Sequence, residues 1–133
     1  MTDLHDDDGT LLRVLIGITA ADELDSEEGL ASLSAGYQRL SGRVLDGATL
    51  AAEREQARTH GAEWLDAARE LGRRLDDEAK QAVLAAAFEV AFADGFVLDE
   101  EDRVLATLAA ALGLNEAEYR QTVDRLLAAA HGA

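Results

Sequence analysis

Apolar residues recur along the chain with a helical spacing, and no segment alternates between apolar and polar in the manner of a strand. Residues 10–21 are apolar on almost every side, which predicts a buried helix. A second helix is predicted from Ser26 to a stop at Gly42, because glycine readily takes the left-handed conformation that ends helices. The apolar face of this second helix contains Leu30, Leu33, Tyr37 and Leu40.

The middle of the chain predicts two further helices, separated by Gly61. Asp46 is a suitable N-cap for a helix over residues 48–59, since its carboxylate accepts a hydrogen bond from a free backbone N–H group. After Gly61 an apolar stripe predicts a helix that ends near residue 75. The stripe consists of Trp64, Ala68, Leu71 and Leu75.

The last third of the chain predicts three helices with clear ends. Asp76 is a suitable N-cap for the longest of them, which is apolar on most sides from Val83 onward. The next helix ends at Gly113, and Asn115 with Glu118 forms a capping box that opens the last one. Together these segments predict an all-α fold, a single compact bundle of about seven helices.

One carboxylate interrupts the apolar run of the longest helix. Glu89 lies between Val83 and Phe92, where a charged group must be paired or face outward. Arg13, in the equally apolar first helix, is the candidate partner.

Composition agrees with one helical domain. The chain has 133 residues, no proline and few aromatic residues. We interpret residues 1–9 as a disordered acidic N-terminus and residues 10–133 as a single all-helical domain. The N-terminus has aspartates where a secretory signal has basic residues, and the longest uncharged apolar run, residues 14–21, is too short to span a membrane. We therefore expect a soluble cytoplasmic protein without membrane insertion.

The net charge of -15 restricts the partners, because 27 acidic residues stand against 12 basic ones. Nucleic acid and anionic membranes require a basic face, so cations or basic proteins are the expected partners. A single lysine, Lys80, together with the general acidic excess, is also typical of a salt-adapted host or a GC-rich genome.

Two acidic turns, residues 21–28 and 93–101, lie about seventy residues apart, each between two predicted helices. This predicts an internal helix-turn-helix duplication. Clustered carboxylates repel one another unless water, a cation or a basic partner offsets their charge. The chain has no cysteine, which excludes thiolate metal sites and leaves hard divalent cations such as calcium, magnesium or manganese as candidate ligands.

The second turn and the helix after it resemble the TerB-like family, which is named from tellurite-resistance proteins and also occurs at the N-terminus of the DjlA co-chaperone. The family pattern is a duplicated Ala-x-Ala-Asp-Gly-x-hydrophobic-Asp-x-Glu-Glu turn between helices. Residues 92–97, 99–101 and 109–114 correspond to this pattern, with one extra residue before Asp99. The first turn departs from it, because Glu23 replaces the glycine and the turn is one residue shorter. The resemblance covers residues 10 to 130.

The resemblance implies an all-helical, non-enzymatic domain of bacterial stress-response systems whose acidic surfaces bind metal ions or partner proteins. It also implies which carboxylates form the site. The candidate metal ligands are Asp22, Asp25 and Glu28 in the first turn and Asp94, Asp99 and Glu101 in the second.

The two acidic turns also admit other interpretations. An EF-hand is rejected because Val90 and Phe92 occupy positions where that loop needs oxygen ligands. Capping also explains the clustered acids without any ligand, because their carboxylates cap the following helices and complement the positive helix ends. Two functions stay open: a metal-responsive module, and a protein-interaction domain that docks a basic partner without an ion. An enzyme is not expected, since no recognisable nucleophile, metal triad or phosphate loop is present.

Overall fold

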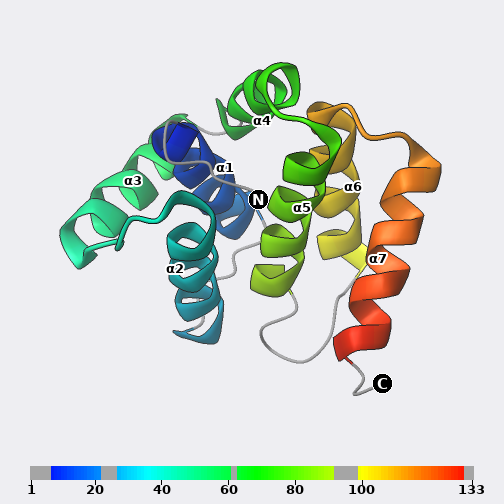
Figure 1. Ribbon diagram of the computed structural model, residues 1–133. Helices are drawn as coiled ribbons and strands as arrows, with labels where there is room; N and C mark the ends of the chain where they lie inside the picture. Colours follow the sequence, from blue (N-terminus) through cyan, green and yellow to red (C-terminus); the bar gives the residue numbers. More distant parts are fainter. Residues whose placement is uncertain (1–6, 22–26, 61–62, 92–98, 131–133) are drawn as a thin grey trace.

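The computed structural model describes residues 7–21, 27–60, 63–91 and 99–130. These residues form seven α-helices, in agreement with the predicted number and fold class (Figure 1). They are α1 (Asp8–Ala21), α2 (Glu27–Ser41), α3 (Gly47–His60), α4 (Glu63–Arg74), α5 (Asp77–Ala91), α6 (Asp99–Leu112) and α7 (Glu116–Ala130).

The helices form one bundle in which α4 joins the two ends of the molecule. α1 packs most extensively against α4, α2 against α5, and α4 also against α6. In Figure 1, α1, α2 and α3 lie on one side, α5 is central, and α6 and α7 lie on the other side, with α4 across the top. The two predicted helix pairs, α1–α2 and α5–α6, are thus connected twice, through α4 and through the packing of α2 on α5.

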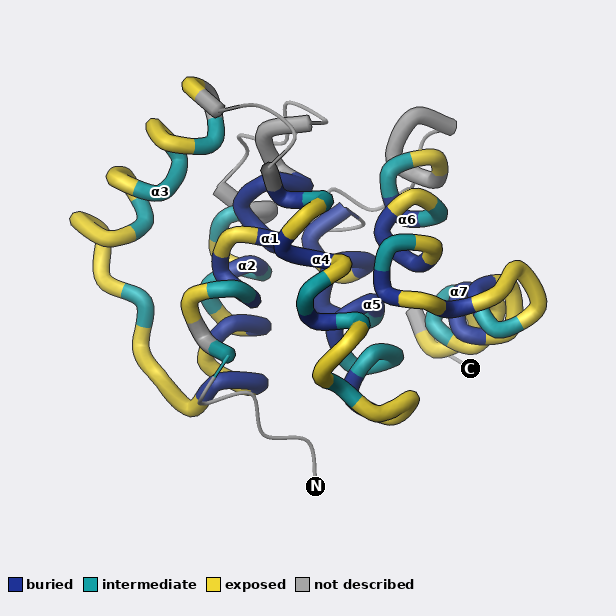
Figure 2. The backbone as a smooth tube through the Cα atoms, turned by 90° about the horizontal axis from the view of Figure 1, so that it is seen from above, coloured by how far each residue is buried: buried dark blue, intermediate teal, exposed yellow. Residues whose placement is uncertain are grey.

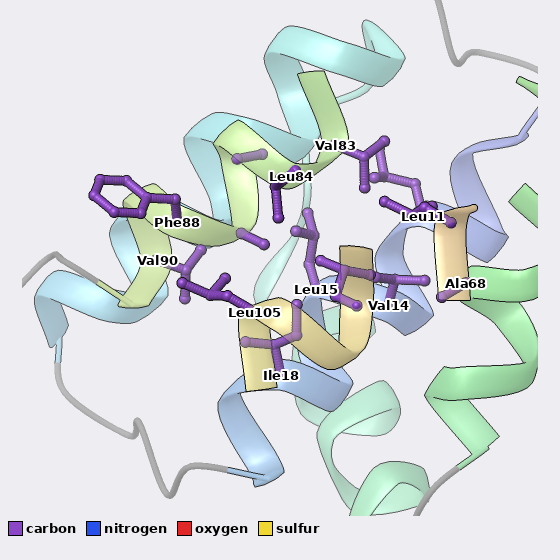
Figure 3. Packing of buried hydrophobic residues seen from close by; sticks show 14 of the residues in the cluster. Leu11, Val14, Leu15, Ile18, Ala68, Val83, Leu84, Phe88, Val90 and Leu105 are labelled. Atoms are coloured by element: carbon purple, nitrogen blue, oxygen red, sulfur yellow. The ribbon is translucent and has the colours of Figure 1, made fainter. Parts of the chain in front are cut away.

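The core is centred on α1 and α5, the two most apolar helices. Side chains of α1 point toward those of α5, and residues of α4 and α6 complete the cluster (Figure 3). Each fully buried leucine or isoleucine contributes roughly 1.5–3 kcal/mol relative to an exposed one. The labelled members include Leu11, Val14, Leu15 and Ile18 of α1, Val83, Leu84 and Val90 of α5, Ala68 of α4 and Leu105 of α6.

Glycines at two helix crossings let α4 approach its neighbours closely. A Cβ atom on Gly17 of α1 would lie 2.1 Å from the Cβ atom of Trp64. A Cβ atom on Gly72 of α4 would lie 2.6 Å from the carbonyl oxygen of Leu112 in α6. Neither separation is possible for real atoms, so both positions require glycine if α4 is to keep its place between α1 and α6.

The helix starts confirm the predicted caps. The Asp46 carboxylate accepts a hydrogen bond from the backbone N–H of Thr49 at 2.7 Å, and that of Asp76 accepts one from Ala79 at 2.8 Å. A reciprocal capping box opens α7: the Glu118 N–H donates to the side chain of Asn115 at 2.8 Å, and the Asn115 N–H donates to that of Glu118 at 3.0 Å.

Two helices end at glycines in the left-handed region, as predicted. Gly42 follows α2 with a φ of 75°, and Gly113 follows α6 with a φ of 91°. At the end of α6 the N–H of Leu114 donates to Ala109 and that of Gly113 to Ala110, which is a Schellman motif. The ammonium group of Lys80 lies 3.5 Å from the position a Cβ on Gly113 would take, where a positive charge complements the negative helix end.

Two details differ from the sequence predictions. α1 begins at Asp8, two residues before the expected start, while residues 1–6 of the predicted disordered N-terminus lie outside the described part. The predicted pairing of Glu89 with Arg13 is wrong. Glu89 faces outward and its carboxylate lies 3.1 Å from the guanidinium of Arg39 on α2, because α2 packs along α5 at that position.

The described helices were also assessed against the length and hydropathy of a membrane span. None of them is long and apolar enough to cross a bilayer.

Candidate functional site

The candidate ligands lie at the edges of the described structure. Asp22, Asp25 and Asp94 fall outside the described residues. The backbones of Glu28, Asp99 and Glu101 belong to the first turns of α2 and α6, while their side chains lie outside the described part. The predicted ligand set therefore stays a prediction.

The helix ends that flank the two turns share one side of the molecule. α1 and α5 both run toward the lower side in Figure 1, and α2 and α6 both start there and run back. The two helix pairs that flank the turns, α1–α2 and α5–α6, are thus oriented alike within the bundle. The positive amino ends of α2 and α6 lie on the same side, and acidic side chains in a first helical turn are favoured by that partial charge.

Carboxylates elsewhere in the described structure show what such residues do at helix starts. Hydrogen bonds from the backbone N–H and the side chain of Thr49 hold the pKa of Asp46 below its ordinary value, because they stabilise the charged form. Asp76 and Glu118 likewise bind free N–H groups at the starts of α5 and α7. Capping is thus an established use of acidic side chains in this chain.

Within the described ranges, no three histidine or acidic side chains are grouped so that they would hold a metal ion. Several described carboxylates instead contact arginines or cap helices. Arg39 and Glu89 join α2 to α5 with both side chains about half exposed, so this pair contributes little to stability.

An ionic contact that sequence reasoning missed ties the N-terminus to α4. The Asp7 carboxylate, 12% exposed, lies 2.9 Å from one terminal guanidinium nitrogen of Arg74, and the other terminal nitrogen lies 3.6 Å from the Glu70 carboxylate. The buried oxygen of Asp7 has no partner in hydrogen-bonding geometry, so the contact with Arg74 is an ion pair rather than a directed hydrogen bond. No local sequence pattern connects residues so far apart.

A small cavity lies between α1 and α3. It has a volume of about 20 Å³, roughly enough for one water molecule. Its lining combines charged, amide and apolar groups from the two helices: Arg13, Ile16, Glu53, Gln56 and Ala57. The cavity is too small for a cofactor, and no candidate ligand of the acidic turns lines it.

Comparison with known proteins identifies the family. The family model described as tellurite resistance protein TerB matches residues 10–124, which run from α1 into the second half of α7. No curated protein and no solved structure matches the chain. The family match covers most of the chain, and the all-α arrangement agrees with the expected fold. The chain therefore belongs to the TerB family.

Proposed function

We propose that this chain is a non-enzymatic, cytoplasmic module of the bacterial tellurite-resistance stress response, and that its two acidic turns bind a hard divalent cation, calcium, magnesium or manganese. Membership of the TerB family supports the association with tellurite resistance. The sequence contains no recognisable nucleophile, metal triad or phosphate-binding loop, which supports a binding role rather than a catalytic one.

The placement of charge along the chain carries the proposal. The two turns together with the adjoining Asp102 contain ten acidic side chains and no basic one, and residues 1–8 contain four more acids. The rest of the chain has thirteen acids and twelve bases. An adaptation to salt would distribute acids over the whole surface, whereas here almost all the excess lies in the two turns and the N-terminus. Such local excess is what a cation would neutralise.

The orientation of the helices supports a shared role for the two turns. The described ends of α1, α2, α5 and α6 that flank the turns lie on one side of the molecule (Figure 1). Calcium takes six to eight oxygen ligands, more than the three candidate carboxylates of either turn supply as single ligands. Bidentate carboxylates, backbone carbonyls and water complete the coordination in this proposal, whether the turns share one ion or hold one each.

The direct test is the thermal midpoint of chelator-treated protein with and without millimolar calcium, magnesium or manganese, at constant ionic strength. The proposal expects a rise of several degrees for at least one ion. Asp94→Asn and Asp22→Asn should abolish this rise. Asp77→Asn is the matched control, because Asp77 is an exposed acid in the first turn of α5 and outside both turns. An equal response of Asp77→Asn and Asp94→Asn would contradict a specific site.

A second candidate function is an acidic surface that docks a basic protein and needs no ion. The capping carboxylates of Asp46, Asp76 and Glu118 support it, because backbone N–H groups alone stabilise these three acids at helix starts. Partner capture from cell extract that is lost at high salt and in Asp94→Asn, yet unaffected by chelator, would support this function. Capture that survives both would exclude the acidic turns as the docking surface.

A further inference from the structure

α3 is the helix that packs least deeply. Among its described side chains none is buried, whereas every other helix contributes several buried residues. Figure 2 shows α3 along the outer edge of the molecule, with only one face partly covered. The half-buried residues Leu50, Glu53, Arg54 and Ala57 follow the spacing of a helix laid on a surface, and two of the four are charged. Little apolar area therefore holds α3 against the bundle.

A small gap, partly open to solvent, lies at the interface between α1 and α3. The cavity between α1 and α3 has Arg13 and Ile16 of α1 on one wall and Glu53, Gln56 and Ala57 of α3 on the other. A void next to polar groups weakens the dispersion contacts across an interface and lets water replace them. α1, by contrast, is fixed from other directions, chiefly by α4 and also by α2 and α5.

The hydrogen bond that caps the start of α3 does not depend on the packing of α3 against α1. Asp46 caps the helix through Thr49, so this cap moves with the helix if it leaves α1. The connection from α2 is exposed on both sides of Leu45, which is partly buried against the core: Val44 is 76% exposed, and a Cβ atom on Gly42 or Gly47 would meet nothing within 4 Å. Rotation about this connection therefore meets no steric obstacle at these positions.

From these observations we infer that α3 is a lid helix. It opens from α1 as one unit while the remaining helices stay packed. The opening uncovers Ile16 and also Leu12, which lies one turn earlier on α1. Both residues are buried when the lid is closed. This device goes beyond the proposed cation site and does not depend on it.

Hydrogen exchange of the full chain tests the inference, because a helix of 14 residues detached from its neighbours is only marginally stable in water, so its amides then exchange without global unfolding. We expect amides of residues 47–60 to exchange on the order of 100-fold faster than those of residues 77–91. Amides of α1 should keep the protection of α5. Equal protection in α3 and α5, or exchange of α1 in step with α3, would overturn the lid.

Two variants sharpen this test. Leu50→Ala removes apolar contact from the lid, and Asp46→Ala removes its cap; each should speed exchange in α3 by roughly 10-fold and leave α5 unchanged. Leu126→Ala is the matched control, a half-buried leucine on α7 that should affect α7 and not α3. If Leu50→Ala accelerates α3 and α5 equally, α3 opens only by global unfolding and the inference fails.

Thiol labelling provides a measurement of the uncovered surface. The chain has no cysteine, so a single introduced cysteine is the only reactive thiol. Ile16→Cys should react with a thiol reagent at least 10-fold faster than Leu84→Cys, which is reached only by global unfolding. Leu50→Ala, which removes a contact that the lid makes with the core, should speed labelling at position 16 and not at position 84. Equal labelling rates at the two positions would contradict the lid.

Discussion

At the scale of single residues, the contact between Gly17 and Trp64 leaves no room for a methyl group. Gly17→Ala should therefore lower the free energy of unfolding by about 1–3 kcal/mol or more, because α1 and α4 must separate to admit the new atom. Urea denaturation measures this change.

Gly9→Ala is the control for this prediction. Gly9 lies in the same helix, and a Cβ atom there would meet nothing within 4 Å. This substitution should leave the free energy of unfolding unchanged or raise it by up to about 1 kcal/mol. Equal losses in the two variants would show that the close approach of α1 and α4 is not what requires glycine at position 17.

The Asp46 carboxylate provides a second prediction at this scale, one that depends on pH. Its pKa is lowered in the folded protein chiefly by the hydrogen bond from the Thr49 backbone. The cap thus stabilises α3 fully above the ordinary carboxyl pKa, and this contribution is lost as pH falls through the lowered value. NMR titration should find the pKa below its ordinary value, and exchange rates of α3 in Asp46→Ala and the parent chain should converge in acid. A difference that persists unchanged in acid would contradict this origin.

At the scale of helices, the capping box of α7 satisfies two backbone N–H groups at once. Asn115→Ala should lower the free energy of unfolding by about 1 kcal/mol, as measured by urea denaturation, because the N–H of Glu118 loses its acceptor. Asn115→Asp should retain most of the stability, since a carboxylate accepts the same hydrogen bond. Similar losses in both variants would indicate that the amide group itself, rather than a cap, is needed.

The seven helices were predictable because their signals are local. Apolar spacing, the caps at Asp46, Asp76 and Asn115, and the terminal glycines Gly42 and Gly113 all act within a few residues of the chain. The amphipathic faces also identified the core, as Leu33 of α2 and Leu71 of α4 are fully buried.

The arrangement of the helices was not predictable from these signals. The close crossings of α4 with α1 and α6 depend on glycines whose partners are distant in sequence, such as Gly72 and Leu112. The ion pair of Glu89 is a further example, because its true partner, Arg39, is set by how α2 lies along α5. For the candidate site, the sequence identified the acidic turns, but the geometry of a ligand set depends on contacts between segments about seventy residues apart.

At the scale of the whole molecule, the concentrated charge predicts a response to salt. Raising sodium chloride from about 10 mM to 200 mM shortens the Debye length from roughly 30 Å to below 10 Å and screens repulsion between like charges. The thermal midpoint of the chain should therefore rise with salt.

The turns should account for most of this rise. The double variant Asp99→Asn/Glu101→Gln removes two charges from the second turn and should show a smaller rise with salt. Its control is Glu116→Gln/Asp124→Asn, which removes two charges from α7, outside the turns. Equal salt responses in the two double variants would mean that repulsion is distributed over the surface.

The position of Trp64 gives the molecule an optical reporter. Trp64 is the only tryptophan, it is 7% exposed, and it lies directly against Gly17. Its fluorescence emission therefore reports the polarity at the joint between α1 and α4. Movement of α3 alone should leave the emission maximum in place, whereas separation of α4 from α1 should shift it to longer wavelength. The emission wavelength of Trp64 therefore distinguishes the opening of α3 from the separation of α4 and α1.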